Sequence, residues 1–340
     1  MAEGGKPGMK NPIGNSGMAL LLAVGVISVL SALVIRFGTA TEAAMTRAFR
    51  FQDDTLLQAM AESGVAIGCR LLFADKAEGD SDSLLDTWAR ADTVDFGELF
   101  AEGSLRVSIE DLSGLLPLNR LAARGDADPE GAGALQFREV LVRLLLGGEF
   151  GDIDEDRART VADSLGDWLD GDDKPLPYGA ENAYYLSREH PVLARNGPVE
   201  FVDELLAVKG VDAELLYGNN EQRGLAEYIS IYGNGRININ TAPVAIIVAL
   251  AGSVPEEAAR ELDEARRDRG STTMLDNPDW YRSLSGWPQG VVIDPGLIAT
   301  RSSVFRVSAD AVKDARSVGM QAEVRRDDEE IVVYQRRYSR

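Results

Sequence analysis

The residue types best suited to chemistry gather in one acidic stretch, from Asp167 to Glu181. Hard cations such as Ca²⁺ take roughly six to eight oxygen ligands from carboxylates, carbonyls and waters. The first acids stand at the C-terminal end of a predicted helix, where the helix dipole already adds negative charge, so a cation is expected to compensate them. Two prolines stiffen the connection that would return Glu181 to this helix end. We therefore predict a calcium site with the ligands Asp170, Asp172 and Glu181.

Other interpretations of this loop stay open. Asn182 and the backbone carbonyl of Tyr178 are weaker candidate ligands, and the alternative to any metal is a solvated acidic loop with Lys174 as its partial counter-ion. The separate acidic run Asp152–Asp156 imitates the start of an EF-hand. However, Arg157 stands where that loop requires glycine, so we predict helix N-capping there instead.

Catalytic chemistry finds little support in the sequence. The single histidine, His190, precedes a proline, and no serine elbow, cysteine–histidine pair, phosphate-binding loop or dinucleotide fingerprint accompanies it. The single cysteine, Cys69, cannot form an intramolecular disulfide, and we expect it to be a small buried apolar side chain. We predict no catalytic residues and no enzymatic activity, and a membrane-tethered periplasmic hydrolase is disfavoured.

Two segments resemble pieces of the helix-hairpin-helix motif, namely 205–211 and 237–244. In DNA-binding versions the glycine-containing hairpin offers backbone N–H groups to a phosphate. This chain has 55 Asp and Glu against 35 Lys and Arg, a net charge of −20, and acids flank the first segment. Because negative charge repels phosphate, we predict structural hairpins and no nucleic-acid partner. A membrane-tethered DNA-uptake protein is the alternative.

The elements that position this loop begin with an apolar N-terminal segment. A leader with Lys6 and Lys10 is followed by Gly17-Met18 and by 18 uncharged residues, 18–35. As a helix this run is about 27 Å long, and its Leu, Val and Ile side chains favour a bilayer by roughly 3 to 7 kcal/mol. The junction resembles a type IV prepilin site, which is cut before the apolar stretch, whereas a secretory signal is cut after it. We predict cleavage after Gly17 and a retained membrane helix; the alternative is a signal peptide cut near residues 38–40.

The helical pattern continues past the apolar run to about residue 75 without a proline. One helix over 18–75 would be about 85 Å long, and its last third suits the face of a globular domain. Alternation of apolar and polar residues predicts strands at 105–109, 304–309, 318–324 and 331–338. The short polar connections between the last three strands imply an antiparallel meander.

The region between the first strand and the last three is helical by pattern, with helices predicted over 135–146, 154–169 and 198–208. It holds 23 Asp and Glu against 11 Lys and Arg, a net of −12. The predicted fold class is α+β: a long N-terminal transmembrane and amphipathic helix packed on an antiparallel sheet, with a large all-α domain inserted between strands. The predicted divisions are a leader at 1–17, a membrane segment at 18–35, its helical continuation at 36–75, an α/β domain at 76–111 and 236–340, and the insertion at 112–235.

Five segments in a fixed order resemble the K-type minor pseudopilin of bacterial type II secretion systems, the general secretion pathway protein K family. They are the Gly17–Leu22 junction, the Val107–Gly114 strand with Leu118-Asn119 behind it, the loop from Asp167–Asp172 to Gly179–Asn182, the Asp203–Val211 hairpin and Ile237–Pro243. Most pilin-like proteins carry Glu at the fifth mature position. This chain has Leu22 there, which agrees with the K type.

The resemblance implies a pilin-like α/β domain with a helical insertion that binds calcium. It also implies a protein without enzymatic activity, cut and methylated at Met18 by prepilin peptidase. Its expected location is the bacterial inner membrane, single-pass, with the globular region in the periplasm. The implied partners are the I-type and J-type minor pseudopilins and the inner-membrane assembly platform. In most pilin-like proteins the fifth-position Glu pairs with the N-terminal amine of the subunit above, so Leu22 suits the tip of the pseudopilus.

Overall fold

A computed structural model of the chain describes residues 1, 14–76, 79–122, 132–233, 235–252, 254–327 and 329–339. The predicted leader, with Lys6 and Lys10, lies outside these residues except for its first residue and 14–17. The described chain forms two compact units, Met1–Leu57 and Gln58–Arg340.

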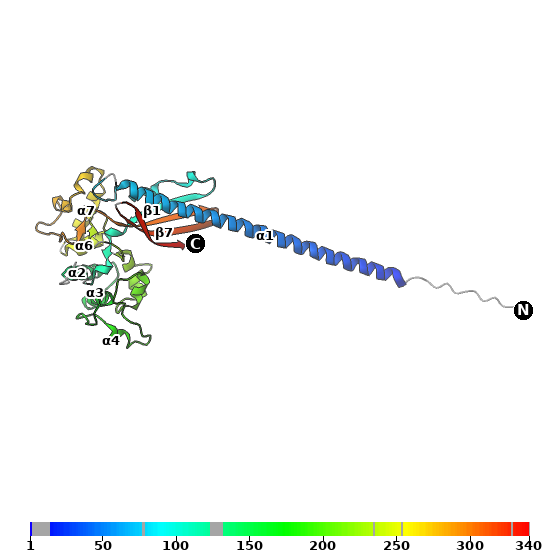
Figure 1. The fold of residues 1–340 in the computed structure, drawn as a ribbon, viewed down its shortest axis with the longest axis horizontal. Coiled ribbons are helices and arrows are strands. Elements are labelled where there is room, and N and C mark those ends of the chain that lie inside the picture. Colours follow the sequence, from blue (N-terminus) through cyan, green and yellow to red (C-terminus); the bar gives the residue numbers. More distant parts are fainter. Residues whose placement is uncertain are drawn as a thin grey trace. The chain divides into compact units, whose positions relative to one another are not determined.

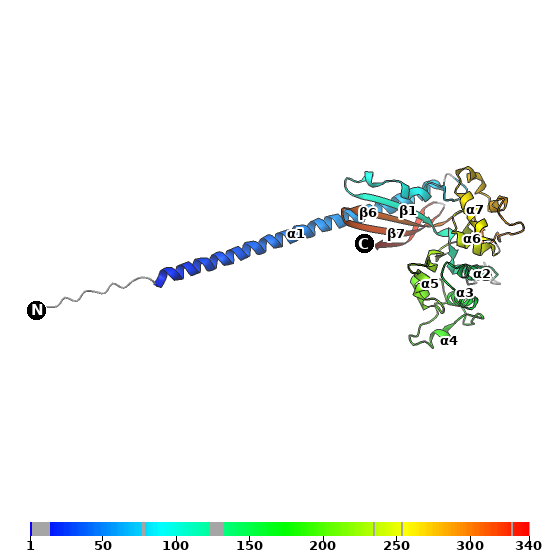
Figure 2. The ribbon, with the colours of Figure 1, turned by 180° about the vertical axis from the view of Figure 1, so that it is seen from behind.

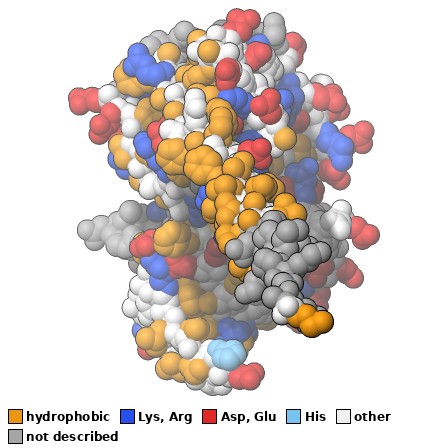
Figure 3. Space-filling model, turned by 90° about the vertical axis from the view of Figure 1, so that its right-hand side faces the viewer, with side chains coloured by type: hydrophobic (Ala, Val, Ile, Leu, Met, Phe, Trp, Pro, Cys, Tyr) orange, Lys and Arg blue, Asp and Glu red, His pale blue; other side chains and the backbone are white. Residues whose placement is uncertain are grey.

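Helix α1 spans Gly14–Asp75 without a break, in agreement with the predicted long helix. In the part of α1 that belongs to the first unit, every residue from Gly17 to Gln52 is exposed. Figure 3 shows the hydrophobic side chains gathered on this helix. Several hydroxyl groups along it bond to the helix itself; for example, Ser28 Oγ donates to the Val24 carbonyl at 2.8 Å. By length and composition, this helix is long enough and apolar enough to cross a membrane. Such a segment, with its polar groups satisfied internally, suits a hydrocarbon environment.

The second unit contains a four-stranded antiparallel sheet in the order β1-β6-β7-β8 (Figure 1). The strands are β1 (Ser104–Asp111), β6 (Val304–Lys313), β7 (Arg316–Arg326) and β8 (Ile331–Ser339). All four predicted strands are present, and the last three form the predicted meander. Strand β1 pairs with β6 across the whole insertion, with Ser108 opposite Ser308.

The part of α1 that lies in the second unit, from Gln58 to Asp75, packs closely on one face of this sheet. Gly64 and Gly68 lie one helical turn apart over strands β1 and β6. A methyl group at Gly64 would lie 2.6 Å from Ala309 Cβ, and one at Gly68 would lie closer still to Val307. The two glycines therefore let the helix approach the sheet to a distance that a side chain would prevent.

The chain leaves the sheet at the end of β1 and returns at β6, and the helical insertion lies between these points (Figure 2). Its helices are α2 (Ala132–Leu145), α3 (Glu155–Leu169), α4 (Asn182–Tyr185), α5 (Ala213–Tyr217), α6 (Val244–Ala251) and α7 (Glu256–Arg266). Two-residue strands pair in parallel, β2 (Leu116–Pro117) with β3 (Ile229–Ser230) and β4 (Ile237–Asn238) with β5 (Ile298–Ala299). The helix expected over 198–208 is a shorter 3-10 helix, Val202–Ala207, because Glu204 accepts hydrogen bonds from the backbone N–H groups of residues 200 and 201 and fixes its start there.

The hydrophobic core of the insertion continues across the predicted boundary at 235/236. The buried side chains of α6 and α7, such as Ile247 and Leu262, share one hydrophobic core with Phe137 and Leu141 of α2. Helix α6 is apolar on nearly all sides, so it needs partners on more than one face. This core extends from Leu112 to Val304, so by packing the helices up to about residue 303 belong with the insertion. Of the residues that follow, the C-terminal meander joins β1 in the sheet.

Candidate metal centre

Helix α3 delivers the first residues of the acidic loop. Asp154 caps its start by accepting a hydrogen bond from the Arg157 backbone N–H at 2.7 Å, as the sequence predicts. At the other end Asp167 lies on the buried face and is 0% exposed, and Asp170 is the C-terminal cap residue. One carboxylate oxygen each from Asp167, Asp170 and Glu181 lies within 4.8 Å of the others. The loop after α3 thus returns Glu181 to the helix end.

Glu181 is the most unusual member of this group. It is only 3% exposed, and neither of its buried carboxylate oxygens has a hydrogen-bond partner among the described residues. Burial raises the pKa of Glu181 to about 7, and the charges of Asp167 and Asp170 add to the effect. A buried carboxylate without a partner is costly, so a ligand that binds these oxygens would offset that cost.

Asp167 is held by the loop that follows it. Its carboxylate accepts hydrogen bonds from the Leu176 backbone N–H at 3.1 and 3.2 Å. Gly179 lies directly against it, where a methyl group would overlap the carboxylate. Burial raises the pKa of Asp167 to about 6. The ring of Tyr185 packs edge-on against Trp168, with ring centroids 5.1 Å apart, and closes the apolar side of the site.

The structure brings Asp170 and Glu181 together but does not bring Asp172 into the same group. Asp172 Oδ1 accepts a hydrogen bond from the Lys174 backbone N–H at 2.8 Å, in a turn of its own. The amide oxygen of Asn182 accepts from the Ala194 N–H, and the Tyr178 carbonyl accepts from Lys209 Nζ. These groups are therefore already engaged.

Asp167 takes the place that the sequence analysis gave to Asp172. It stands three residues before Asp170 on α3, and residues three apart share a helix face. That spacing could have identified Asp167 as the nearer partner of Asp170.

The donor set fits a hard cation. All three groups are carboxylates, two of them are buried, and no Lys or Arg side chain bonds to the Glu181 oxygens among the described residues. Oxygen-only ligands suit Ca²⁺ or Mg²⁺ better than a transition metal, which prefers nitrogen and sulfur. An ion held by these three carboxylates would tie the loop to α3.

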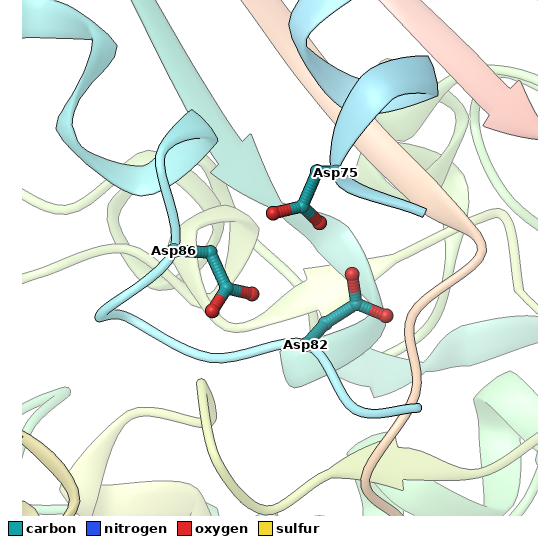
Figure 4. Close-up of side chains that lie close together, drawn as sticks. All are labelled: Asp75, Asp82 and Asp86. Atoms are coloured by element: carbon teal, nitrogen blue, oxygen red, sulfur yellow. The ribbon is translucent and has the colours of Figure 1, made fainter. Parts of the chain in front are cut away.

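A second acidic group lies at the end of α1. Figure 4 shows Asp75 on the helix and Asp82 and Asp86 on the connection that follows, with their carboxylates turned toward one another. Here a cation is already present in the chain: Arg326 donates hydrogen bonds to both Asp75 and Asp82 and is 3% exposed in its side chain. Asp86 accepts from Ser83 and from the Trp88 indole. We assign this group a structural role.

The segment 237–244, which resembles a DNA-binding hairpin in sequence, forms a largely buried junction instead. Asn238 donates to the Asp82 carbonyl at 3.0 Å and to Ser302 Oγ at 2.7 Å. Asn240 accepts from the Trp280 indole at 2.8 Å, and Thr241 Oγ1 donates to Asp111 at 2.5 Å. The segment therefore joins the end of β1, the start of β6 and the α6–α7 region, and residues 237–240 are buried in this junction.

Comparison with known proteins gives this architecture a family. The family model for type II secretion system protein K matches residues 114–219. Type II secretion system protein K of Klebsiella pneumoniae is 31% identical over 275 residues, which are 76% of this chain and 77% of that protein. The chain belongs to the type II secretion system protein K family. It is thus a minor pseudopilin, as the sequence resemblance implied, and DNA uptake is not supported.

Other members and one solved structure agree with this assignment. The protein K of Pseudomonas aeruginosa is 28% identical over 268 residues, covering 75% of this chain and 74% of that protein. The crystal structure of the GspK–GspI–GspJ complex from enterotoxigenic Escherichia coli contains a chain with the same fold, at a TM-score of 0.64 and 19% identity. The match covers 86% of this chain and 99% of that chain, so the predicted α+β class is confirmed.

Proposed function

We propose that this chain forms the tip of a type II secretion pseudopilus together with I-type and J-type minor pseudopilins. The observation that carries the proposal is family membership, joined to one exposed apolar helix that continues onto a pilin-like sheet. The relative of known structure was solved in a complex with GspI and GspJ. The apolar segment would anchor the chain in the inner membrane, and the globular unit would stand in the periplasm.

Leu22 supports the tip position. In a fibre body, an acid at this place would pair with the N-terminal amine of the next subunit above. Leu22 is exposed on α1 and offers an apolar side chain instead. A subunit that lacks this acid needs no neighbour above it, so it can begin a fibre. We infer that the tip complex primes assembly on the inner-membrane platform after prepilin peptidase has processed each subunit, and that the growing fibre then pushes folded proteins toward the outer membrane.

Cross-linking tests the tip position. A photoreactive residue at Ala66, an exposed position on α1, is expected to give conjugates with another minor pseudopilin and no ladder of self-conjugates. The same residue at the equivalent place in the major pseudopilin is the control, and it should give a ladder. A self-conjugate ladder from the Ala66 variant would place this subunit along the shaft and overturn the proposal.

We propose further that Asp170, Glu181 and Asp167 hold Ca²⁺. The ion would supply the positive charge that the unpartnered Glu181 carboxylate lacks. The site is made of an irregular loop, and the larger Ca²⁺ tolerates such geometry better than Mg²⁺, which demands a near-regular octahedron.

Calcium is expected to raise the unfolding temperature of the full chain by several degrees, since an ion at a hundred times its Kd stabilises by about 2.7 kcal/mol. Glu181→Gln should abolish most of this rise and, in chelator at pH 8, should unfold at a higher temperature than the parent because it removes a buried charge. Asp172→Asn is the matched control and should keep most of the rise. Equal unfolding temperatures of the parent in calcium, magnesium and chelator would contradict the site, and loss of the rise in Asp172→Asn would restore the ligand set predicted from sequence.

A further inference from the structure

We propose that Lys209 is the positioning residue of the acidic loop. Its ammonium group would hold the turn at 176–180 so that Glu181 faces Asp167 and Asp170, and calcium affinity would depend on it. The inference rests on the calcium site proposed above. It also gives a role to the 205–211 hairpin, whose resemblance to a DNA-binding motif the pseudopilin function does not explain.

Lys209 reaches the loop from a separate part of the chain. Its Nζ donates to the carbonyls of Tyr178 and Gly179, at 3.1 Å each, and lies 5.4 Å from the centre of the Tyr184 ring. Its backbone N–H donates to Tyr185 Oη at 3.3 Å. One lysine thus contacts the loop both before and after Glu181.

The hairpin that carries Lys209 is itself fixed to α3. Gly210 has a φ of +86°, a conformation that side chains disfavour, and a methyl group there would lie 3.1 Å from Val161. The backbone after Lys209 therefore sits tightly on the helix. Since Asp167 and Asp170 end the same helix, the ammonium group and these carboxylates share one rigid support.

The turn at 176–180 is held from two sides. On one side Asp167 accepts from the Leu176 N–H, and on the other Lys209 donates to the Tyr178 and Gly179 carbonyls. Within the turn the Gly179 N–H donates to the Leu176 carbonyl at 3.0 Å. Glu181 comes two residues after Gly179, directly after the turn, so the position of Glu181 depends on this turn. Without Lys209, two carbonyls lose their donor and the turn loses its link to the hairpin.

Charge and geometry predict opposite effects, and this makes the inference testable. A positive charge beside a cation site repels the ion, so removal of the charge alone should tighten calcium binding. Removal of a positioning group should weaken it, and substitutions of groups that orient metal ligands typically cost about 10- to 100-fold in affinity. Lys174 is a matched control, because it lies exposed in the same loop. Its backbone N–H donates a hydrogen bond to Asp172, and the substitution keeps that group.

The experiment is calcium titration by calorimetry of the full chain in detergent, for the parent, Lys209→Met, Lys209→Arg and Lys174→Met. We expect Lys209→Met to bind calcium about 10-fold more weakly. Lys174→Met should bind as tightly as the parent or more tightly, and Lys209→Arg, which keeps charge and N–H donors, should recover most of the loss. Binding by Lys209→Met that equals or exceeds that of the parent would overturn the inference while leaving the calcium site intact.

Hydrogen exchange in chelator provides a readout that needs no metal. The Leu176 and Gly179 amides are expected to exchange faster in Lys209→Met than in the parent, and to be unchanged in Lys174→Met. Unchanged exchange in Lys209→Met would show that the lysine does not hold the turn and would overturn the inference. Failure of the parent to bind calcium would overturn both the calcium site and the role of Lys209. The titration of the parent alone distinguishes this outcome from failure of the Lys209 inference.

Discussion

Replacing Arg326 by Met is expected to lower the free energy of unfolding by about 3 to 5 kcal/mol at pH 8, because loss of one partner leaves buried charges uncompensated. The Arg326 guanidinium donates to Asp75 and Asp82, and also to the carbonyls of Leu72 and Ser302. It lies 4.8 Å from the centre of the Phe305 ring. Denaturant titration measures the loss.

This loss should shrink as the pH falls. Burial, followed by the charges of Asp86 and Asp82, raises the pKa of Asp75 from an ordinary 3.8 to about 7 in the folded state. Between these values the folded chain holds a proton that the unfolded chain does not, so acidification from pH 8 to pH 5 favours folding at this group. A protonated Asp75 needs no counter-cation, so Arg326→Met should cost less at pH 5 than at pH 8.

Arg325→Met is the control for Arg326. It stands next on the same strand, but its ion pair with Asp327 is at the surface, where such pairs contribute about 0 to 1 kcal/mol. A loss for Arg326→Met no larger than that of Arg325→Met would refute the buried counter-ion role. A loss that does not change with pH would refute the part assigned to Asp75.

Replacing Gly17 by Val is expected to abolish processing and with it secretion. A methyl group at Gly17 would meet no described atom within 4 Å, so the substitution leaves α1 undisturbed and any failure reflects recognition by the peptidase. Intact-mass measurement of the membrane-extracted protein should show a parent chain that lacks 17 residues and begins at a methylated Met18. The variant should keep its full length.

Gly25→Val is the matched control for processing, since it makes the same exchange within the apolar segment, also without a steric clash. It should be cut like the parent. A parent chain that begins near Thr41, or a soluble periplasmic form, would contradict both the retained membrane helix and the prepilin type of cleavage.

The sheet domain was largely predictable from sequence because its signals are local. Strands β6, β7 and β8 each alternate apolar and polar residues and are joined by short polar turns. Their number and order therefore follow from residues that are close in sequence. Helix α1 likewise follows from periodicity over a long stretch without proline. The extent of the insertion depends instead on the packing of α6 against α2. These two helices are about a hundred residues apart in sequence, so no local sequence pattern predicts their contact.

The candidate site was predictable in its location and less so in its members. The density of acids identifies the loop, and Glu181 returns to α3 as expected. Whether Asp167 or Asp172 faces Glu181 depends on the direction of the turn after α3. That turn is fixed by Lys209, about thirty residues downstream, and by the close contact of Gly179 with Asp167. Such long-range contacts cannot be predicted from the residue types within the loop.

The pairing of β1 with β6 sets the order in which the molecule can fold. Ser108 and Ser308 are opposite each other but two hundred residues apart in sequence. Closing so long a loop is slow, and chains rich in such distant pairings fold slowly. The insertion has its own core and can collapse as soon as it is delivered, whereas β1 and the glycine face of α1 must wait for the last strands. During that interval an apolar helix face and an unpaired strand edge are exposed, so we expect the chain to be most vulnerable to aggregation and proteolysis just before its C-terminus is delivered.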